Sequence, residues 1–183
     1  MKLFVGQISK SLCNNLISEC KNHTVDPHNG NMDLNPGDLF YEDHLEQKRL
    51  AKEAGYTAGN SIEFRHYYPD EHFDSIFVKE FENITDTQCM LSFVSEIRPG
   101  KCAPWHWDIN PWLNDYPQKD IVRFVCFIDK PKPGQAFMVE DECFYMQEQG
   151  SIFKYPRLDS WHAGFNAGLE NKFLFTFTGA KSL

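Results

Sequence analysis

Apolar residues recur at two different periods along this chain, and the period changes near residue 87. In the first part they lie three and four residues apart, which is the spacing of one face of a helix. A first helix is expected between Ser9, a favourable N-cap residue, and about Asn22. Its apolar face consists of Leu12, Leu16, Ile17 and Cys20. The same spacing predicts helices over about residues 41–54 and 73–81.

The expected helix over residues 41–54 is highly charged, and Gly55 is placed to cap its C-terminus. We therefore expect it on the outside of the molecule, where few of its residues are available for packing. Those residues are Leu45, Leu50, Ala51 and Ala54. Residues 23–38, which precede it, are rich in Asn, Gly, Pro and Asp and predict a long loop. Such a loop is either a lid over a site or a plain surface excursion.

From residue 88 onward, nearly every segment has the apolar and turn pattern of a β-strand. Eight short strands are expected, at about residues 88–98, 101–108, 120–128, 135–140, 143–147, 151–155, 160–163 and 172–178. Two further β-prone stretches lie at 3–8 and 61–68. Eight short strands joined by turns are typical of a jelly roll. The sequence therefore predicts a mainly β protein of the α+β type: a double-stranded β-helix, or cupin-like barrel, with N-terminal helices buttressing one sheet.

The chain has 183 residues and a formal net charge of −8. This length suits one domain over 1–183, with residues 1–87 as mostly helical support and 88–178 as the core. The negative charge argues against nucleic acid as a partner, because binding it needs a dense Lys and Arg surface. No apolar stretch reaches the length of a signal peptide or a membrane span, so no membrane association is expected. No pattern in the sequence indicates an oligomeric state.

The cysteines are scattered, and none forms a Cys-x-x-Cys pair. They are Cys13, Cys20, Cys89, Cys102, Cys126 and Cys143. This arrangement predicts buried, reduced thiols in a cytosolic (cytoplasmic) protein rather than a cysteine-ligated zinc site.

Candidate metal ligands lie in two segments, 101–108 and 160–166. On a β-strand, side chains two residues apart share a face, so His106 and Asp108 point the same way. Trp105 and Trp107 then point the other way, into the core. Together with a second imidazole these side chains form a facial triad, which holds Fe(II) and leaves positions open for O2 and a co-substrate. The alternative is a pair of unrelated histidines.

Two similar groups of residues are set aside because of their context. The triplet that contains His72 and Asp74 falls in the expected helix over 73–81, and His44 and Glu46 fall in the expected helix over 41–54. Residues two apart on a helix diverge by about 200° and cannot hold one ion.

Six segments, in their order, resemble the Fe(II)/2-oxoglutarate-dependent oxygenases, most nearly the aspartyl/asparaginyl β-hydroxylase and prolyl hydroxylase branches. They are 96–100, His106-x-Asp108, 121–125, 150–153, 161–166 and Lys172. The resemblance covers about residues 88–178. It implies that His106, Asp108 and His162 bind the catalytic iron, with Fe(II), 2-oxoglutarate and O2 as the cofactors. One carboxylate and two neutral imidazoles would leave an Fe(II) site with a charge of +1, which suits an anionic 2-oxo acid.

The resemblance also assigns two basic residues. In that family a basic residue about ten positions beyond the distal His, here Lys172, holds the far carboxylate of 2-oxoglutarate. Strand alternation turns Lys172 into the barrel and turns Phe173, Phe175 and Phe177 toward the helices. An inward lysine needs an anion; the alternative is a solvated lysine at a strand start. Arg123 is either a ligand of a co-substrate or substrate carboxylate, or one partner of a structural ion pair.

The resulting expectation is an oxygenase that hydroxylates an Asp, Asn or Pro side chain, in a small molecule or a peptide. Trp112 and Tyr116, in the loop after the first ligand strand, are placed to line the substrate entrance. Two alternatives remain at this stage: a cupin-type metalloenzyme that does not use 2-oxoglutarate, and a non-catalytic binding module stabilised by a metal.

Overall fold

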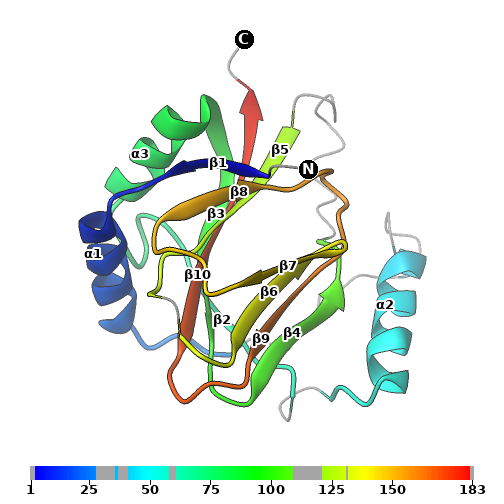
Figure 1. Cartoon of the computed structure of the whole chain (residues 1–183). Coiled ribbons are helices and arrows are strands. Elements are labelled where there is room, and N and C mark those ends of the chain that lie inside the picture. The colour runs from blue at the N-terminus through cyan, green and yellow to red at the C-terminus, as the bar shows by residue number, and fades with distance from the viewer. Residues whose placement is uncertain are drawn as a thin grey trace.

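The strands form two facing sheets, with α1 and α3 on one side and α2 on the other (Figure 1). The computed structural model describes residues 3–27, 36, 41–57, 61–108, 121–130 and 132–181. The helices are α1 (Lys10–Lys21), α2 (Tyr41–Glu53) and α3 (Ile76–Thr85). The strands are β1 (Phe4–Gln7), β2 (Arg65–Tyr67), β3 (Thr87–Ile97), β4 (Lys101–His106), β5 (Ile121–Cys126), β6 (Gln135–Val139), β7 (Glu142–Tyr145), β8 (Ser151–Lys154), β9 (His162–Asn166) and β10 (Lys172–Lys181).

The sheet topology is that of a jelly roll. One sheet has the strand order β1-β8-β5-β10-β3-β2 and the other has the order β4-β9-β6-β7. All the strand pairings are antiparallel. Within the described residues, the eight strands from β3 onward divide equally between the two sheets, as in a double-stranded β-helix. The predicted fold class is confirmed, and β1 and β2 extend the larger sheet at its two edges.

Two apolar cores lie on the two faces of the larger sheet. The outer core joins this sheet to α1 and α3, and it contains Phe173, Phe175 and Phe177 of β10. The inner core fills the space between the sheets and contains Leu174. Because side chains alternate along β10, its three phenylalanines lie under the helices and Leu174 lies in the barrel. The predicted orientation of this strand is therefore confirmed.

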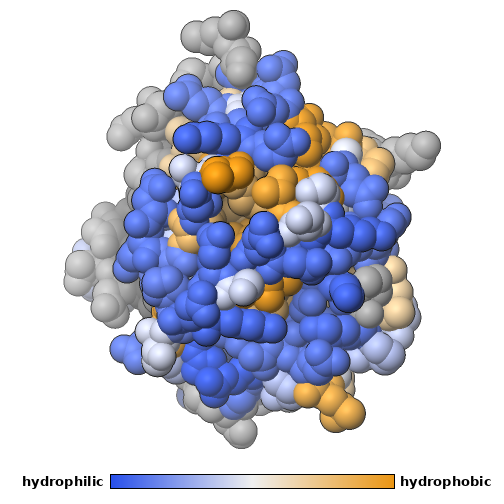
Figure 2. Space-filling model, turned by 90° about the vertical axis from the view of Figure 1, so that its left-hand side faces the viewer, coloured by the Kyte–Doolittle hydropathy of each residue, from blue (hydrophilic) through white to orange (hydrophobic). Residues whose placement is uncertain are grey.

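The predicted first helix is also present, with Ser9 as its N-cap. The Ser9 hydroxyl accepts a hydrogen bond from the backbone N–H of Leu12 at 3.3 Å. The buried residues of α1 are Cys13, Leu16, Ile17 and Cys20. Leu12 also packs against the outer core, and most other residues of the helix are exposed. The surface on this side of the molecule is hydrophilic over most of its area (Figure 2).

We expect Ser9→Ala to lower the free energy of unfolding by about 1 kcal/mol, because one N–H group of the first turn loses its acceptor. For a chain of this length that corresponds to a fall of about 2–4 °C in the thermal midpoint. Ser11→Ala, in the same turn, is the matched control and should cause no loss, because alanine is the better helix former. Thermal unfolding followed by circular dichroism checks both variants, and equal midpoints would contradict the capping role.

Two details of the helices differ from the sequence-based expectation. The third helix begins at Ile76 rather than at residue 73, because an Asp74 carboxylate oxygen accepts the N–H of Ile76 at 2.9 Å. His72 and Asp74 therefore precede the helix, so helical geometry was the wrong reason to set them aside. In α2, Leu45 and Leu50 are 41% and 42% exposed and do not pack as predicted. The buried residue of this helix is His44.

All six cysteines carry free thiols. Four are buried, Cys89 is partly buried and Cys143 is exposed, so the prediction of buried thiols is wrong for Cys143. Burial raises the pKa of the Cys20 thiol to about 12, which keeps it protonated. Among the described residues, no helix is long and apolar enough to cross a membrane.

Candidate metal centre

Antiparallel pairing of β4 with β9 brings His106 directly opposite His162, although the two residues lie far apart in the sequence. Their ring centroids are 4.3 Å apart. Asp108 lies two residues beyond His106, where β4 has ended. One potential ligand atom from each of these three side chains lies within 4.8 Å of the other two. Within the described part of the chain, this is the one such group of His, Cys, Asp or Glu residues.

Asp108 lies between the two imidazoles. Its Oδ1 is 3.5 Å from His106 Nε2, and its Oδ2 is 3.4 Å from His162 Nε2. Two ligands that each lie about 2.0–2.2 Å from a metal are separated by roughly 3.0–3.5 Å at bond angles between a right angle and the tetrahedral angle. The spacing of these atoms therefore suits three ligands of one ion.

Backbone carbonyls set the tautomer of both imidazoles. Nδ1 of His106 lies 2.5 Å from the carbonyl oxygen of Pro104, and Nδ1 of His162 lies 3.0 Å from that of Ser160. A carbonyl oxygen only accepts, so each Nδ1 must carry the hydrogen. The lone pair of each neutral ring is then on Nε2, which faces Asp108. This second hydrogen bond is the usual way in which proteins orient metal-binding histidines.

Arg123 completes the group from inside the larger sheet. Its buried guanidinium donates to Asp108 Oδ2 at 2.7 Å and to the Thr178 hydroxyl at 3.2 Å. Of the two alternatives for Arg123, the structure shows the ion pair. Its charge also changes the expected balance: Fe(II), one carboxylate, one guanidinium and two neutral imidazoles give +2 rather than the +1 expected without Arg123. A site with that charge is matched by a dianion.

The ionisable groups respond to burial and to one another. Burial alone would raise the pKa of Asp108, but the charge of Arg123 and the nearby histidines hold it well below its usual range. Burial lowers the pKa of His106, but the hydrogen bond that its protonated ring donates to the Asp108 carboxylate and the negative charge of Asp108 outweigh it, and the net shift is upward. Burial and the charge of His106 lower the pKa of His162. A deprotonated carboxylate and a neutral His162 are the forms that bind metal.

Lys172 points inward, as predicted, and is 3% exposed. Its Nζ donates to the carbonyl oxygen of Ala136 and, at 3.5 Å, to that of Phe165. Within the described residues, no carboxylate lies within ion-pair distance of Lys172. A methyl group placed on Gly164 would lie 4.0 Å from this Nζ, and Gly164 itself lines the cavity that contains the triad. The ammonium group is therefore just behind the cavity wall.

The triad lies in the wall of a cavity of about 670 Å³. Its inner part is formed by barrel residues, among them Ile97, Phe137, Tyr155 and Leu174. Its outer part is formed by residues that the sequence-based prediction missed: His44, Gln47, Lys48, Ala51 and Lys52 of α2, and Phe64, His66, Tyr68 and Phe93. The five residues of α2 recur at helical spacing, which was a signal, but a polar stripe on a helix usually faces solvent.

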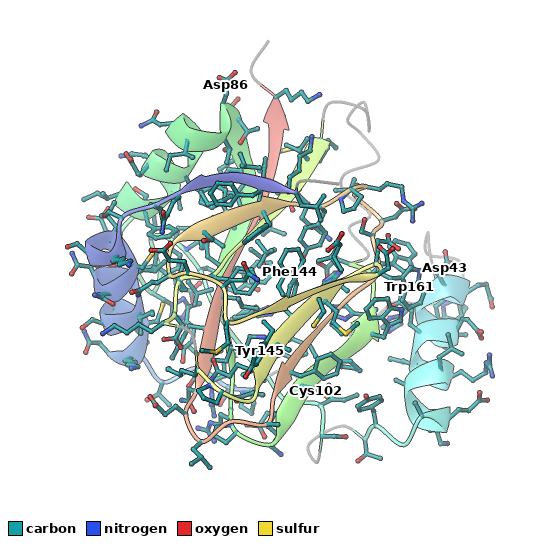
Figure 3. All side chains as sticks on the ribbon, in the orientation of Figure 1. Asp43, Asp86, Cys102, Phe144, Tyr145 and Trp161 are labelled. Atoms are coloured by element: carbon teal, nitrogen blue, oxygen red, sulfur yellow. The ribbon has the colours of Figure 1, made fainter. Side chains whose placement is uncertain are left out.

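The predictions for the aromatic residues are only partly testable in the described part of the chain, and the one for Trp105 is wrong. Trp105 is 40% exposed and stacks on Trp161 at 6.4 Å between centroids, so its predicted place in the core is wrong. Trp105 belongs to neither apolar core and instead lines the cavity together with residues of α2, which contacts β4. Trp161 lies on the side of the barrel that α2 faces (Figure 3). Trp107 is partly exposed and lines the cavity. Trp112 and Tyr116 lie outside the described residues.

The donor set fits iron. Two imidazole nitrogens and one carboxylate oxygen that converge from one side, with open space opposite, are the ligand set of non-haem Fe(II) oxygenases. Structural zinc sites instead use four ligands, often with cysteine. Within the described residues, no cysteine belongs to this group.

Neither a protein-family model nor a curated protein sequence matches the chain. Several solved structures resemble it at low identity. The viral collagen prolyl hydroxylase of Paramecium bursaria Chlorella virus-1, as its 2OG complex, is 16% identical over 88% of this chain and 98% of that one, with a TM-score of 0.46. A prolyl-4-hydroxylase from Pseudomonas putida is 13% identical over 93% and 100%, with a TM-score of 0.46. A predicted oxalate decarboxylase from Thermotoga maritima is 10% identical over 64% and 81%, with a TM-score of 0.37. Likenesses this distant say nothing about activity, so the chemistry has to be argued from the side chains.

Proposed function

We propose that this protein is an Fe(II)- and 2-oxoglutarate-dependent oxygenase that hydroxylates an Asp, Asn or Pro side chain, free or in a peptide. The observation that carries the proposal is the convergence of His106, Asp108 and His162 on one wall of a large cavity. Buried Lys172 lies behind the same wall. A metal site of two imidazoles and one carboxylate, paired with a nearby buried cation, suits a dicarboxylate co-substrate.

His106 Nε2, His162 Nε2 and an Asp108 oxygen would hold the iron. The chemistry that iron supplies in such a site is reduction of O2, coupled to decarboxylation of 2-oxoglutarate to succinate and CO2 and to insertion of one oxygen atom into a substrate C–H bond. Arg123 would keep Asp108 ionised and fixed by its 2.7 Å contact with Oδ2. Tyr155, whose ring lies 5.2 Å from that of His162, helps to exclude water from this side of the site.

Lys172 would hold the far carboxylate of 2-oxoglutarate. Its Nζ contacts the carbonyl of Phe165, three residues along β9 from His162. Three strand residues span about 10 Å. A five-carbon dicarboxylate bound to the metal would cover part of this distance, and the side chain of Lys172 would cover the rest. Gly164 lines the cavity between them, and the side chains of Ile97 and Phe137 pack against it.

Affinity for 2-oxoglutarate should fall as pH rises above neutrality. Burial lowers the pKa of Lys172 to about 7, with a smaller opposing contribution from Cys143. The ammonium form is the one that pairs with a carboxylate, so below pH 7 it is already present, and above pH 7 binding must take up a proton. The dissociation constant should rise by up to about tenfold per pH unit over this range. Calorimetric titration of the metal-loaded protein checks this, and a flat profile would contradict it. Lys172→Met serves as the control without the titrating amine.

A second candidate is a cupin-type metalloenzyme that does not use 2-oxoglutarate. One observation favours it: Lys172 Nζ is bound to two carbonyls and lines a separate small cavity of about 30 Å³ rather than the large one. In that case Lys172 would be structural. Metal binding without any 2-oxoglutarate binding would support this candidate.

The function is tested by succinate release from 2-oxoglutarate with Fe(II), O2 and a panel of free amino acids and short peptides. Mass spectrometry then looks for a product heavier by one oxygen atom. Succinate formation that depends on an Asp-, Asn- or Pro-containing substrate supports the proposal. Turnover only with methylated nucleotides or fatty acids would overturn the substrate class.

A further inference from the structure

The face of α2 that is turned toward the barrel is polar. The residues of this helix that line the 670 Å³ cavity are His44, Gln47, Lys48, Ala51 and Lys52, which follow one another at helical spacing. Leu45 and Leu50 are not among the residues that line the cavity, and they are 41% and 42% exposed. A helix that only covers a barrel normally turns its apolar side inward. The orientation of α2 therefore indicates a ligand-facing role rather than a packing role.

Three hydrogen-bond donors of α2 have no acceptor within the described residues. Gln47 Nε2 is buried and lacks a hydrogen-bond partner there. Lys48 and Lys52 are exposed at the edge of the cavity, and neither forms an ion pair with a described residue. The glutamates of this helix at positions 46 and 53 are instead bound by Arg49, each at 2.6 Å. Two lysines one turn apart repel each other, and an acidic ligand would relieve that repulsion.

The opposite wall of the outer cavity is aromatic. Phe64, His66 and Tyr68 lie at alternate positions along and beside β2, and Phe93 lies on the neighbouring strand β3. The ring of His66 is 5.1 Å from that of Phe64 and 4.3 Å from that of Phe93. All four residues line the cavity. Such a row accepts apolar and ring-shaped side chains.

The cavity is larger than a metal and a five-carbon acid need. Its volume of about 670 Å³ is in the range of pockets that hold drug-sized ligands. The triad, the polar residues of α2 and the aromatic row all contribute to its lining. The occupant of the outer part must therefore present hydrogen-bond acceptors to α2 and an apolar surface to the aromatic row.

We propose that α2 and this aromatic row bind an acidic polypeptide segment. Its carboxylates pair with Lys48 and Lys52, and an apolar side chain packs on the aromatic row. Gln47 Nε2, which is buried in this structure, donates to a backbone carbonyl of the segment after its side chain turns into the cavity. The inference rests on the proposed function only in that the segment presents its reacting side chain to the triad. Two lysines on a chain of net charge −8 are too few for a nucleic-acid site.

The test is fluorescence polarisation with three short labelled peptides that share a central Phe-Pro and differ in their flanking residues: glutamate, glutamine or lysine. The glutamate peptide should bind most tightly. The double variant Lys48→Glu, Lys52→Glu should weaken its binding by at least about tenfold and should favour the lysine peptide. Lys79→Glu with Lys181→Glu changes the net charge equally at exposed sites outside the cavity and should leave binding unchanged.

Gln47→Met separates recognition from packing. If Gln47 is kept for a ligand, the variant should bind the glutamate peptide several-fold more weakly. The same change should raise the thermal midpoint by about 2–4 °C, because a buried donor without a partner is removed. A variant that loses both stability and binding would indicate a structural role for Gln47.

The outcomes distinguish this surface from the oxygenase activity. Equal binding of all three peptides, an equal loss in the control variant, or tighter binding of an oligothymidylate than of the glutamate peptide overturns the inference. Binding is measured on the metal-free and zinc-loaded protein without turnover. Peptide binding without succinate formation would therefore overturn the proposed function alone, and succinate formation with free amino acids but no peptide binding would overturn this inference alone.

Discussion

His106→Ala and His162→Ala should each abolish 2-oxoglutarate turnover, with a loss of more than about 100-fold. Replacing a residue that only orients a metal ligand typically lowers metal affinity or activity 10–100-fold, and replacing the ligand itself should lower them further. The fold should persist, because the two apolar cores do not include either histidine. Metal content measured by mass spectrometry and turnover measured by succinate release check the prediction.

The matched control for this pair is His23→Ala. His23 is exposed and lies just after α1, away from the cavity-lining residues. It should retain metal and turnover. Stoichiometric metal binding by both His106→Ala and His162→Ala would contradict the triad. If one variant binds metal normally but loses turnover, the histidine replaced in that variant acts in catalysis without being a metal ligand.

Lys172→Met should raise the concentration of 2-oxoglutarate required for half-maximal turnover by at least tenfold. A hydrogen bond to a charged group in a buried site contributes about 1.5–3 kcal/mol, which corresponds to roughly 10–150-fold in affinity. The thermal midpoint should not fall, because methionine fills a similar volume and the relief from burying an ammonium group offsets the lost hydrogen bonds to the carbonyls of Ala136 and Phe165. This opposition between binding and stability is the signature of a lysine kept for a ligand.

Lys181→Met is the control on the same strand, at the exposed end of β10. It removes an equal charge and should change neither the 2-oxoglutarate requirement nor the thermal midpoint. An unchanged 2-oxoglutarate requirement in Lys172→Met would place the anchor elsewhere, with Arg123 as the remaining buried cation at the cavity, or would favour the cupin-type alternative.

The charge of the site links these two predictions. Arg123 neutralises Asp108 within the protein, so a bound divalent metal would bring its full charge to the cavity. Replacing Arg123 by leucine would leave the Asp108 carboxylate without its counter-charge and would weaken its orientation. The ion pair therefore makes Arg123 a positioning residue for a proposed metal ligand, in addition to any contact it makes with a carboxylate of the bound acid.

Much of the fold followed from local pattern, because the period of apolar residues reports secondary structure directly. The alternation along β10 was enough to turn three phenylalanines toward the helices and Lys172 into the barrel. The N-cap at Ser9 could be predicted because it depends on a few neighbouring residues. His106, Asp108 and His162 could be selected because their spacing and order carried information that no single residue has.

The tertiary structure decided which neighbour covers each face, and local pattern does not encode that. Trp105 precedes His106 on β4 but is 40% exposed and lines the cavity beside α2, because the large outer core forms between α1, α3 and the other sheet. The polar stripe of α2 faces a cavity rather than water, which depends on where the helix lies relative to β4. Arg123 pairs with Asp108, and Lys172 with two carbonyls, through contacts between strands distant in sequence. The sequence by itself determined most of the strands, the inward face of β10 and the three candidate ligands. The packing of separate elements, which sums many weak non-local contacts, decided the partners of the charged residues and the shape of the cavity.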